Sequence, residues 1–112
     1  MDSNLLNTSS LTNELFKEQQ DMIKKKIHMR IHARRGSKSI TIIEGLDDDL
    51  DIKRIMKAMR KEFKCNGSIQ EDKVYGEIIQ LQGDQRANAT EWLIVQEILT
   101  KQEAAERIIN HG

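Results

Sequence analysis

One short run of residues, in which apolar and polar side chains alternate, constrains the fold of this chain most strongly. Its apolar positions are Ile27, Met29, Ile31 and Ala33, and the polar positions between them are His28, Arg30, His32 and Arg34. A period of two places all the apolar side chains on one face of a β-strand. A turn around Gly36 leads into the β-rich run 39–44. The pattern predicts a β-hairpin with one buried face and a basic tip.

An amphipathic helix is predicted after this hairpin. Its apolar stripe consists of Ile52, Ile55, Met56, Met59 and Phe63, which have the spacing of one helical face. Asp47, Asp48 and Asp49 precede it, and any of them could cap its N-terminus. The opposite face is basic and carries Lys53, Arg54, Lys57, Arg60, Lys61 and Lys64. Asn66 and Gly67 are expected to end the helix.

The remaining segment predicts a second hairpin, a second helix and a final strand. The hairpin strands are expected at 68–70 and 76–82, and the helix at 85–99 with Asp84 as its cap. Residues 100–106 are polar and are interpreted as a linker, and 107–110 as an edge strand. The predicted order is ββαββαβ. This order indicates an α+β fold, a two-layer α/β plait with a mixed five-stranded sheet and two helices on one face.

Charge divides the chain into two parts. Residues 1–23 contain one lysine and four acids, and we expect them to form a flexible N-terminal tail ahead of a single domain at 24–112. Residues 24–38 contain seven basic residues and no acid. No apolar run is long enough to span a membrane, and no secretory signal is evident. The single cysteine, Cys65, excludes an intramolecular disulfide and fits a reducing, cytoplasmic compartment.

Catalysis finds little support in the residue patterns. No glycine-rich phosphate loop with its Lys-Ser/Thr pair is present, which argues against an enzyme such as a phosphatase of similar topology. His28 and His32 would stand about 13 Å apart on a strand, too far to share a metal ion. We therefore expect no cofactor, no metal site and no enzymatic activity.

Basic side chains favour binding to RNA instead. They gather at 24–26, at the hairpin tip (Arg34, Arg35 and Lys38) and on the first helix. Lysine and arginine side chains on phosphates release counterions and supply much of the affinity for nucleic acid. Aromatic residues for base stacking are scarce, so folded RNA recognised through its shape and phosphates is favoured over single strands. An ordinary solvated helix surface is the alternative interpretation of the basic helix face.

Three segments resemble the eukaryotic translation initiation factor 1 family. The longest is Gly-Glu-Ile-Ile-Gln-Leu-Gln-Gly-Asp-Gln-Arg at 76–86, and the others are Ile-His-Met-Arg-Ile at 27–31 and Phe-Lys-Cys-Asn-Gly at 63–67. The resemblance covers roughly residues 26–112. At the hairpin tip, where the family usually has Asn-Gly-Arg-Lys, this chain has Arg-Gly-Ser-Lys at 35–38. The positive charge thus moves across the glycine.

This resemblance implies a function in start-codon selection. A member of the family binds the small ribosomal subunit near the peptidyl site, promotes scanning, and is displaced when the initiator transfer RNA pairs with a start codon. The hairpin tip, Arg34, Arg35, Gly36, Ser37 and Lys38, would approach ribosomal RNA. The loop Asp72, Lys73, Val74 and Tyr75 would face the initiator transfer RNA. Helix residues Lys53, Arg54, Lys57, Arg60 and Lys61 would contact ribosomal RNA or other initiation factors.

Other roles stay open at this stage. Asp84, Gln85 and Arg86 fit capping and structural support as well as direct contact. A monomer without membrane contacts is expected. A related factor of the same fold acting in reinitiation or recycling, or a general module for structured RNA, would share the fold and the basic surfaces.

Overall fold

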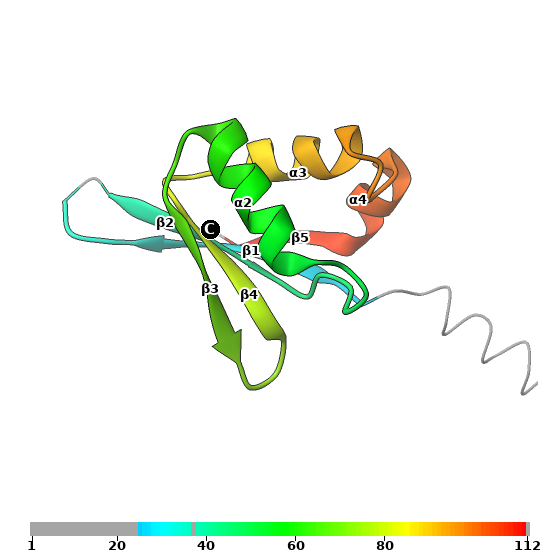
Figure 1. Ribbon diagram of the computed structural model, residues 1–112, viewed down its shortest axis with the longest axis horizontal. Helices are drawn as coiled ribbons and strands as arrows, with labels where there is room; N and C mark the ends of the chain where they lie inside the picture. Colours follow the sequence, from blue (N-terminus) through cyan, green and yellow to red (C-terminus); the bar gives the residue numbers. More distant parts are fainter. Residues whose placement is uncertain (1–24, 37, 112) are drawn as a thin grey trace, which may run out of the picture.

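The computed structural model describes residues 25–36 and 38–111 of the 112-residue chain. Its elements follow in the order β1 (Ile27–Ala33), β2 (Ser39–Glu44), α2 (Ile52–Phe63), β3 (Gly67–Asp72), β4 (Gly76–Gln82), α3 (Arg86–Val95), α4 (Lys101–Arg107) and β5 (Ile108–His111). Figure 1 shows them along the chain. No helix in the described part of the chain is long and apolar enough to cross a membrane. The predicted N-terminal tail, 1–23, lies outside the described residues.

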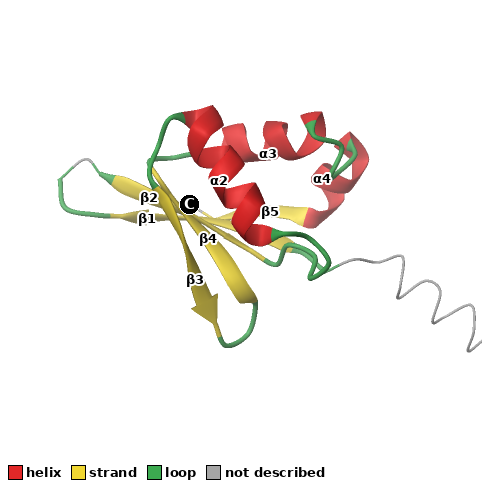
Figure 2. Ribbon diagram, viewed as in Figure 1, coloured by secondary structure: helices red, strands yellow, loops and turns green. Residues whose placement is uncertain are grey.

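The five strands form one mixed sheet in the order β3-β4-β2-β1-β5. All neighbours pair antiparallel except β5, which runs parallel to β1 at the edge of the sheet. The helices lie together on one side of the sheet (Figure 2). The predicted α+β class, with a two-layer arrangement and a mixed five-stranded sheet, is confirmed.

The core lies between the sheet and the helix layer. The most completely buried apolar side chains are Ile27, Met29, Ile43, Met59, Ile79, Leu81 and Leu93. On each long strand they alternate with residues on the opposite face, which none of the described helices covers. Gly45 brings the chain close to the start of β1. With φ of +86°, a Cβ there would lie 2.3 Å from the carbonyl oxygen of Lys26, so only glycine fits.

The structure corrects the start of the first helix. Its N-cap is Asp51, whose side chain accepts a hydrogen bond from the backbone N–H of Arg54, and not Asp47, Asp48 or Asp49. The apolar stripe begins at Ile52, and the acid that caps the helix is the one directly before this residue. The helix ends at Phe63, before the predicted Asn66 and Gly67, and its C-cap Lys64 takes a left-handed conformation with φ of 51°.

The interpretation of 100–106 as a linker was wrong. Most of this segment forms helix α4, and Thr100 caps it in a capping box with Glu103. The Thr-x-x-Glu spacing that marks such a box is present in the sequence. The helix was missed because its apolar face is small, with Ala104 as its only buried apolar residue.

Other boundaries also shift. Helix α3 ends at Val95 and not at Leu99, while β3 extends from Gly67 to Asp72 and not only over 68–70. The last strand begins at Ile108, because Arg107 belongs to α4. In β1, Ile31 is only half-buried and Ala33 is exposed. The strand therefore runs past the part of the sheet that the helices cover, and the alternation outlasts the burial.

Candidate nucleic-acid interface

The hairpin of β1 and β2 projects beyond the rest of the molecule (Figure 1). The backbone N–H of Arg34 donates to the carbonyl of Lys38 at 2.7 Å, which closes the turn. Gly36 has φ of +71° and open space around it. Arg34, Arg35 and Lys38 are all exposed. The three predicted cations thus meet at one protruding end.

Helix α2 presents the second basic surface. Ile52, Ile55, Met56 and Met59 are buried against the sheet, which turns the opposite face to solvent. That face carries the five predicted residues, all of them exposed: Lys53, Arg54, Lys57, Arg60 and Lys61. None of the five forms an ion pair with an acid within residues 25–36 and 38–111. Their charge is therefore available to an anionic partner.

The basic face of α2 also contains a hollow. Lys57, Arg60, Lys61 and Cys65 line an open depression of about 300 Å³. Burial raises the pKa of the Cys65 thiol, while a backbone hydrogen bond and the nearby Arg60 act in the opposite direction. The thiol is thus kept protonated at neutral pH, and the anion-binding groups of the hollow are the three cations.

The loop Asp72–Tyr75 joins β3 to β4 at the end of the second projecting hairpin (Figure 1). A carboxylate oxygen of Asp72 accepts hydrogen bonds from the backbone N–H groups of Val74 at 2.8 Å and Tyr75 at 2.9 Å. These two bonds lower the pKa of Asp72. Val74 is 81% exposed. The carboxylate thus gives the turn a fixed shape that presents an apolar side chain at its tip.

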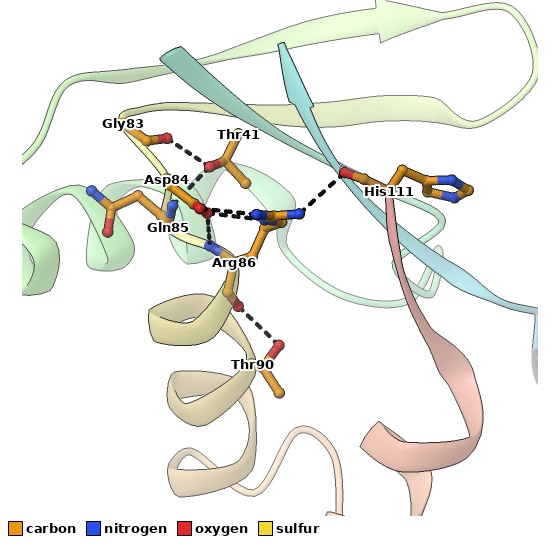
Figure 3. A network of polar contacts seen from close by, with 7 residues as sticks. All are labelled: Thr41, Gly83, Asp84, Gln85, Arg86, Thr90 and His111. Atoms are coloured by element: carbon orange, nitrogen blue, oxygen red, sulfur yellow. Dashed lines mark hydrogen bonds and ion pairs between the residues drawn. The ribbon is translucent and has the colours of Figure 1, made fainter. Parts of the chain in front are cut away.

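Asp84, Gln85 and Arg86 form a polar network at the corner between β4 and α3 (Figure 3). The guanidinium of Arg86 donates to the two carboxylate oxygens of Asp84 at 3.0 and 2.9 Å. This pairing lowers the pKa of Asp84 and raises that of Arg86. A third nitrogen of Arg86 donates to the carbonyl of His111 at 3.3 Å. The corner is thereby tied to β5.

Thr41 fixes the same corner from the buried side. Its side chain is fully buried, and the hydroxyl donates to the carbonyl of Gly83 at 2.7 Å. The same oxygen accepts a hydrogen bond from the backbone N–H of Gln85 at 2.8 Å. The side chain of Gln85 is used internally as well, because it bonds to the carbonyl of Gln82 and to Asn88. These contacts favour the structural interpretation of 84–86. Asp84 does not cap α3 at the N-cap position, which is Gln85.

The predicted site residues therefore form separate groups. The hairpin tip and the loop Asp72–Tyr75 lie at the ends of two hairpins that point in different directions (Figure 1). The cations of α2 lie on the helix layer. Among the described residues no group of three or more His, Cys, Asp and Glu side chains is arranged to hold a metal ion. An extended binding surface fits this arrangement better than a single enclosed site.

Sequence reasoning missed two further features. An open groove of about 700 Å³ runs along α3 toward α4 and β5, with Val95 (66% exposed) and Ile94 among its lining residues. His28 and His111 form a hydrogen-bonded pair across β1 and β5. Both features depend on the position of the C-terminal segment. The capping box at Thr100 was the one local signal that could have indicated how that segment folds.

Comparison with known proteins supports the resemblance seen in the sequence. The family model "Translation initiation factor SUI1" matches residues 23–99. The protein translation factor SUI1 of Eremothecium gossypii is 51% identical over 75 residues, which are 67% of this chain and 69% of that protein. Eukaryotic translation initiation factor eIF-1 of Saccharomyces cerevisiae is 51% identical over 62% of this chain and 65% of its own length. Eukaryotic translation initiation factor 1 of Mus musculus is 52% identical over 61% and 60%.

Among solved structures, the C-terminal domain of human eIF2D shares the fold. The TM-score is 0.59 at 18% sequence identity, over 70% of this chain and 41% of that one. At this identity the likeness concerns the fold alone. The matched segments of the yeast and mouse relatives cover slightly less than two thirds of those proteins.

Proposed function

This chain belongs to the translation initiation factor SUI1 family, and we propose that it binds the small ribosomal subunit near the peptidyl site, where it promotes scanning and accurate start-codon selection. The coarser part of this statement, a role in translation initiation, follows from the relatives' names. Because the relatives are translation factors, the prediction that the chain is not an enzyme is confirmed. We further propose that it acts as a monomer in the cytoplasm, together with other initiation factors.

The observation that carries the proposal is the unpaired charge of the two basic surfaces. The five cations of α2 and the three at the hairpin tip have no acidic partner among the described residues, and all are exposed. Each cation placed on a phosphate adds a counterion-release contribution to affinity. A basic hairpin that projects from a compact body suits a narrow cleft between RNA helices, where a flat surface could not reach.

Displacement requires a second contact that differs between two states of the ribosome. A ligand shifts an equilibrium only through a difference in its affinity for the two states. We propose that the loop Asp72–Tyr75 supplies this difference by occupying space that fully seated initiator transfer RNA needs. The fixed turn made by Asp72 supports this role, because a flexible loop would yield without expelling the protein.

Binding to purified small subunits tests the basic surfaces. The Arg35→Gln variant should bind more weakly. A plot of its log affinity against log salt concentration should also have a slope shallower by about 0.7–0.9. Lys101→Gln is the matched control, since Lys101 is also an exposed cation but lies on α4. Equal losses in both variants would contradict a role for the hairpin tip. Reversing the charge of Arg34, Arg35 and Lys38 together should also relax start-codon stringency in a reconstituted scanning assay.

The displacement step needs its own measurement. Labelled protein bound to small subunits should be released when initiator transfer RNA pairs with a start codon, and retained with a near-cognate codon. Release by any bound transfer RNA, irrespective of the codon, would remove start-codon selection from the proposal. Equal affinity for unrelated folded RNA would instead support a general structured-RNA module. Activity only after termination would support a factor for reinitiation or recycling.

A further inference from the structure

Three rings form a chain on the sheet face that the helices leave uncovered. Nδ1 of His28 lies 2.9 Å from Nε2 of His111, within hydrogen-bonding distance. The ring of Tyr75 lies on the other side of His28, with a centroid distance of 5.6 Å and an angle of 58°. The two imidazoles are 5.1 Å apart between centroids. The rings thus connect β5, β1 and the loop Asp72–Tyr75, three segments that lie far apart in the sequence.

The position of the rings follows from the strand pattern. Ile27 and Met29 point into the core, so His28 between them points to the uncovered face. In the parallel pair, Arg30 is aligned with His111. In Figure 3 the carbonyl of His111 faces Arg86 while its imidazole points away. The backbone of His111 therefore belongs to the corner network, and its ring belongs to the ring chain.

The bond between the two histidines depends on protons. A neutral imidazole has one N–H donor and one bare nitrogen that accepts, whereas a protonated imidazole has two donors. The bond therefore exists when both rings are neutral or when only one is protonated. When both imidazoles are protonated to imidazolium, two N–H groups and two positive charges face each other at the same contact. The pair must then separate.

The charged groups around the pair shift the pKa of His111 in both directions. Arg30 faces it from β1, and Glu44 faces it from β2 while pairing with Arg30 at 3.3 Å. Burial, Arg30 and His28 lower the pKa of His111, and Glu44 partly opposes them. Arg86 contacts only the backbone of His111, and its charge does not change with pH in this range.

The C-terminal end of β5 has few other contacts, because only the first residue of the strand, Ile108, packs against the core. The strand has four residues, lies at the edge of the sheet and pairs with β1 alone. The bond from Arg86 and the contact with His28 anchor its last residue. Tyr75 in turn has one aromatic neighbour among the described residues, the same His28. Movement of His28 would therefore reach both the end of β5 and the projecting loop.

We propose that His28 and His111 are positioning residues that form a proton-dependent latch, which fixes the end of β5 and, through Tyr75, the orientation of the loop Asp72–Tyr75. The latch is closed while at least one imidazole is neutral, and it opens when both are protonated. Its effect on transfer RNA sensing rests on the proposed function. The latch itself does not, because it is a property of the isolated protein.

The direction of the pH effect follows from His111. Its pKa is lowered in the folded protein, so the folded state binds fewer protons than the unfolded state just below pH 6.5. The stabilising contribution is complete above about pH 6.5, the ordinary histidine pKa, and is lost as the pH falls through the folded value. The end of β5 should therefore be released by mild acid.

Hydrogen exchange in the full-length protein tests the latch. Amide protection of β5 and of Lys73–Tyr75, corrected for intrinsic exchange, is compared at pH 7.5 and 5.5 with that of β2 in the same molecule. We expect protection of β5 and the loop to fall several-fold relative to β2, by up to about tenfold for each pH unit between about pH 6.5 and the lowered pKa of His111. Unchanged relative protection would overturn the proposal.

Two variants and a control separate the latch from general acid sensitivity. His111→Gln keeps a neutral hydrogen-bonding group at the same position, so protection should become independent of pH. His111→Ala should lower protection at both pH values. His32→Asn is the control, because His32 lies on the same strand and is exposed, and its profile should match that of the unchanged protein. A normal pH response in His111→Gln would exclude the pair as its source.

A last comparison separates this inference from the proposed function. If start-codon-dependent release from small subunits changes between pH 7.5 and 6.0 in the unchanged protein but not in His111→Gln, the latch positions the sensing loop. If exchange shows the latch while release does not respond to pH, the link to the loop's function is refuted and the latch remains. Failure of all subunit binding would contradict the proposed function alone.

Discussion

Replacing Thr41 by valine tests whether its hydroxyl holds the corner between β4 and α3. Valine has nearly the same shape, so the change removes two hydrogen bonds without creating a cavity. The carbonyl of Gly83 loses its donor at 2.7 Å, and the backbone N–H of Gln85 loses its acceptor at 2.8 Å. The structure thus isolates the contribution of one buried oxygen atom.

The expected cost follows from those two groups. Each buried polar group left without a partner costs about 1–3 kcal/mol. The added methyl group recovers about 0.8 kcal/mol through apolar burial. Gly83 and Gln85 are only half-buried, so water can partly replace the hydroxyl and the lower values apply. Two such groups at about 1–1.5 kcal/mol each, less the gain from the methyl group, give a loss in the free energy of unfolding of about 1–2 kcal/mol for Thr41→Val. The expected fall in Tm is roughly 4–16 °C for a domain of this size.

Urea denaturation of the full-length protein measures this quantity. Thr41→Ser is the matched control, because it keeps the hydroxyl and loses one methyl group, for a cost of about 0.5–1.5 kcal/mol. The valine variant should therefore be less stable than the serine variant. If valine proves equal to serine or better, the hydroxyl does not hold the corner, and the reasoning from the two bonds fails.

Two further predictions concern the C-terminal segment. Arg107 is 5% exposed, pairs with Asp47 at 2.8 Å and donates to the carbonyl of Lys25 at 3.1 Å. Arg107→Met leaves the partly buried carboxylate of Asp47 unpaired, and it should therefore lower the free energy of unfolding by about 2–4 kcal/mol. A double-mutant cycle with Asp47→Asn, followed by urea denaturation, should give a coupling energy above about 1 kcal/mol, and a value near zero would show that the pair is not energetically linked. Thr100→Ala removes the capping box of α4 and should cost about 1 kcal/mol by the same assay, whereas Thr100→Ser should cost little, and similar losses in both would argue against capping.

Local patterns were sufficient to predict most of the sheet and the basic surfaces. The alternation in β1 and the apolar stripe of α2 depend on neighbouring residues, so the sequence displays them directly. The exposed cations of α2 followed from the same stripe, since burial of one face leaves the other in solvent. The α+β class came from the order of these elements.

The errors lie where distant segments decide the structure. Ile31 was predicted to be buried, but how far the helix layer covers β1 is not encoded within β1. The bond between His28 and His111 joins residues 83 positions apart, and no local pattern marks it. Helix α4 is different, because its capping box was visible in the sequence and was not recognised. Its small apolar face hid a signal that was local.

The parallel pairing of β5 with β1 has a consequence for how the protein folds. β1 lies near the start of the described chain and its partner lies at the far end, so the sheet is completed by its most non-local contact. Such contacts form late, because loop closure must precede any gain from pairing. During synthesis the outer edge of β1 stays open until the last strand has emerged, with unpaired backbone groups that other chains could bind. The hairpins and α2, by contrast, can form while the chain is still growing.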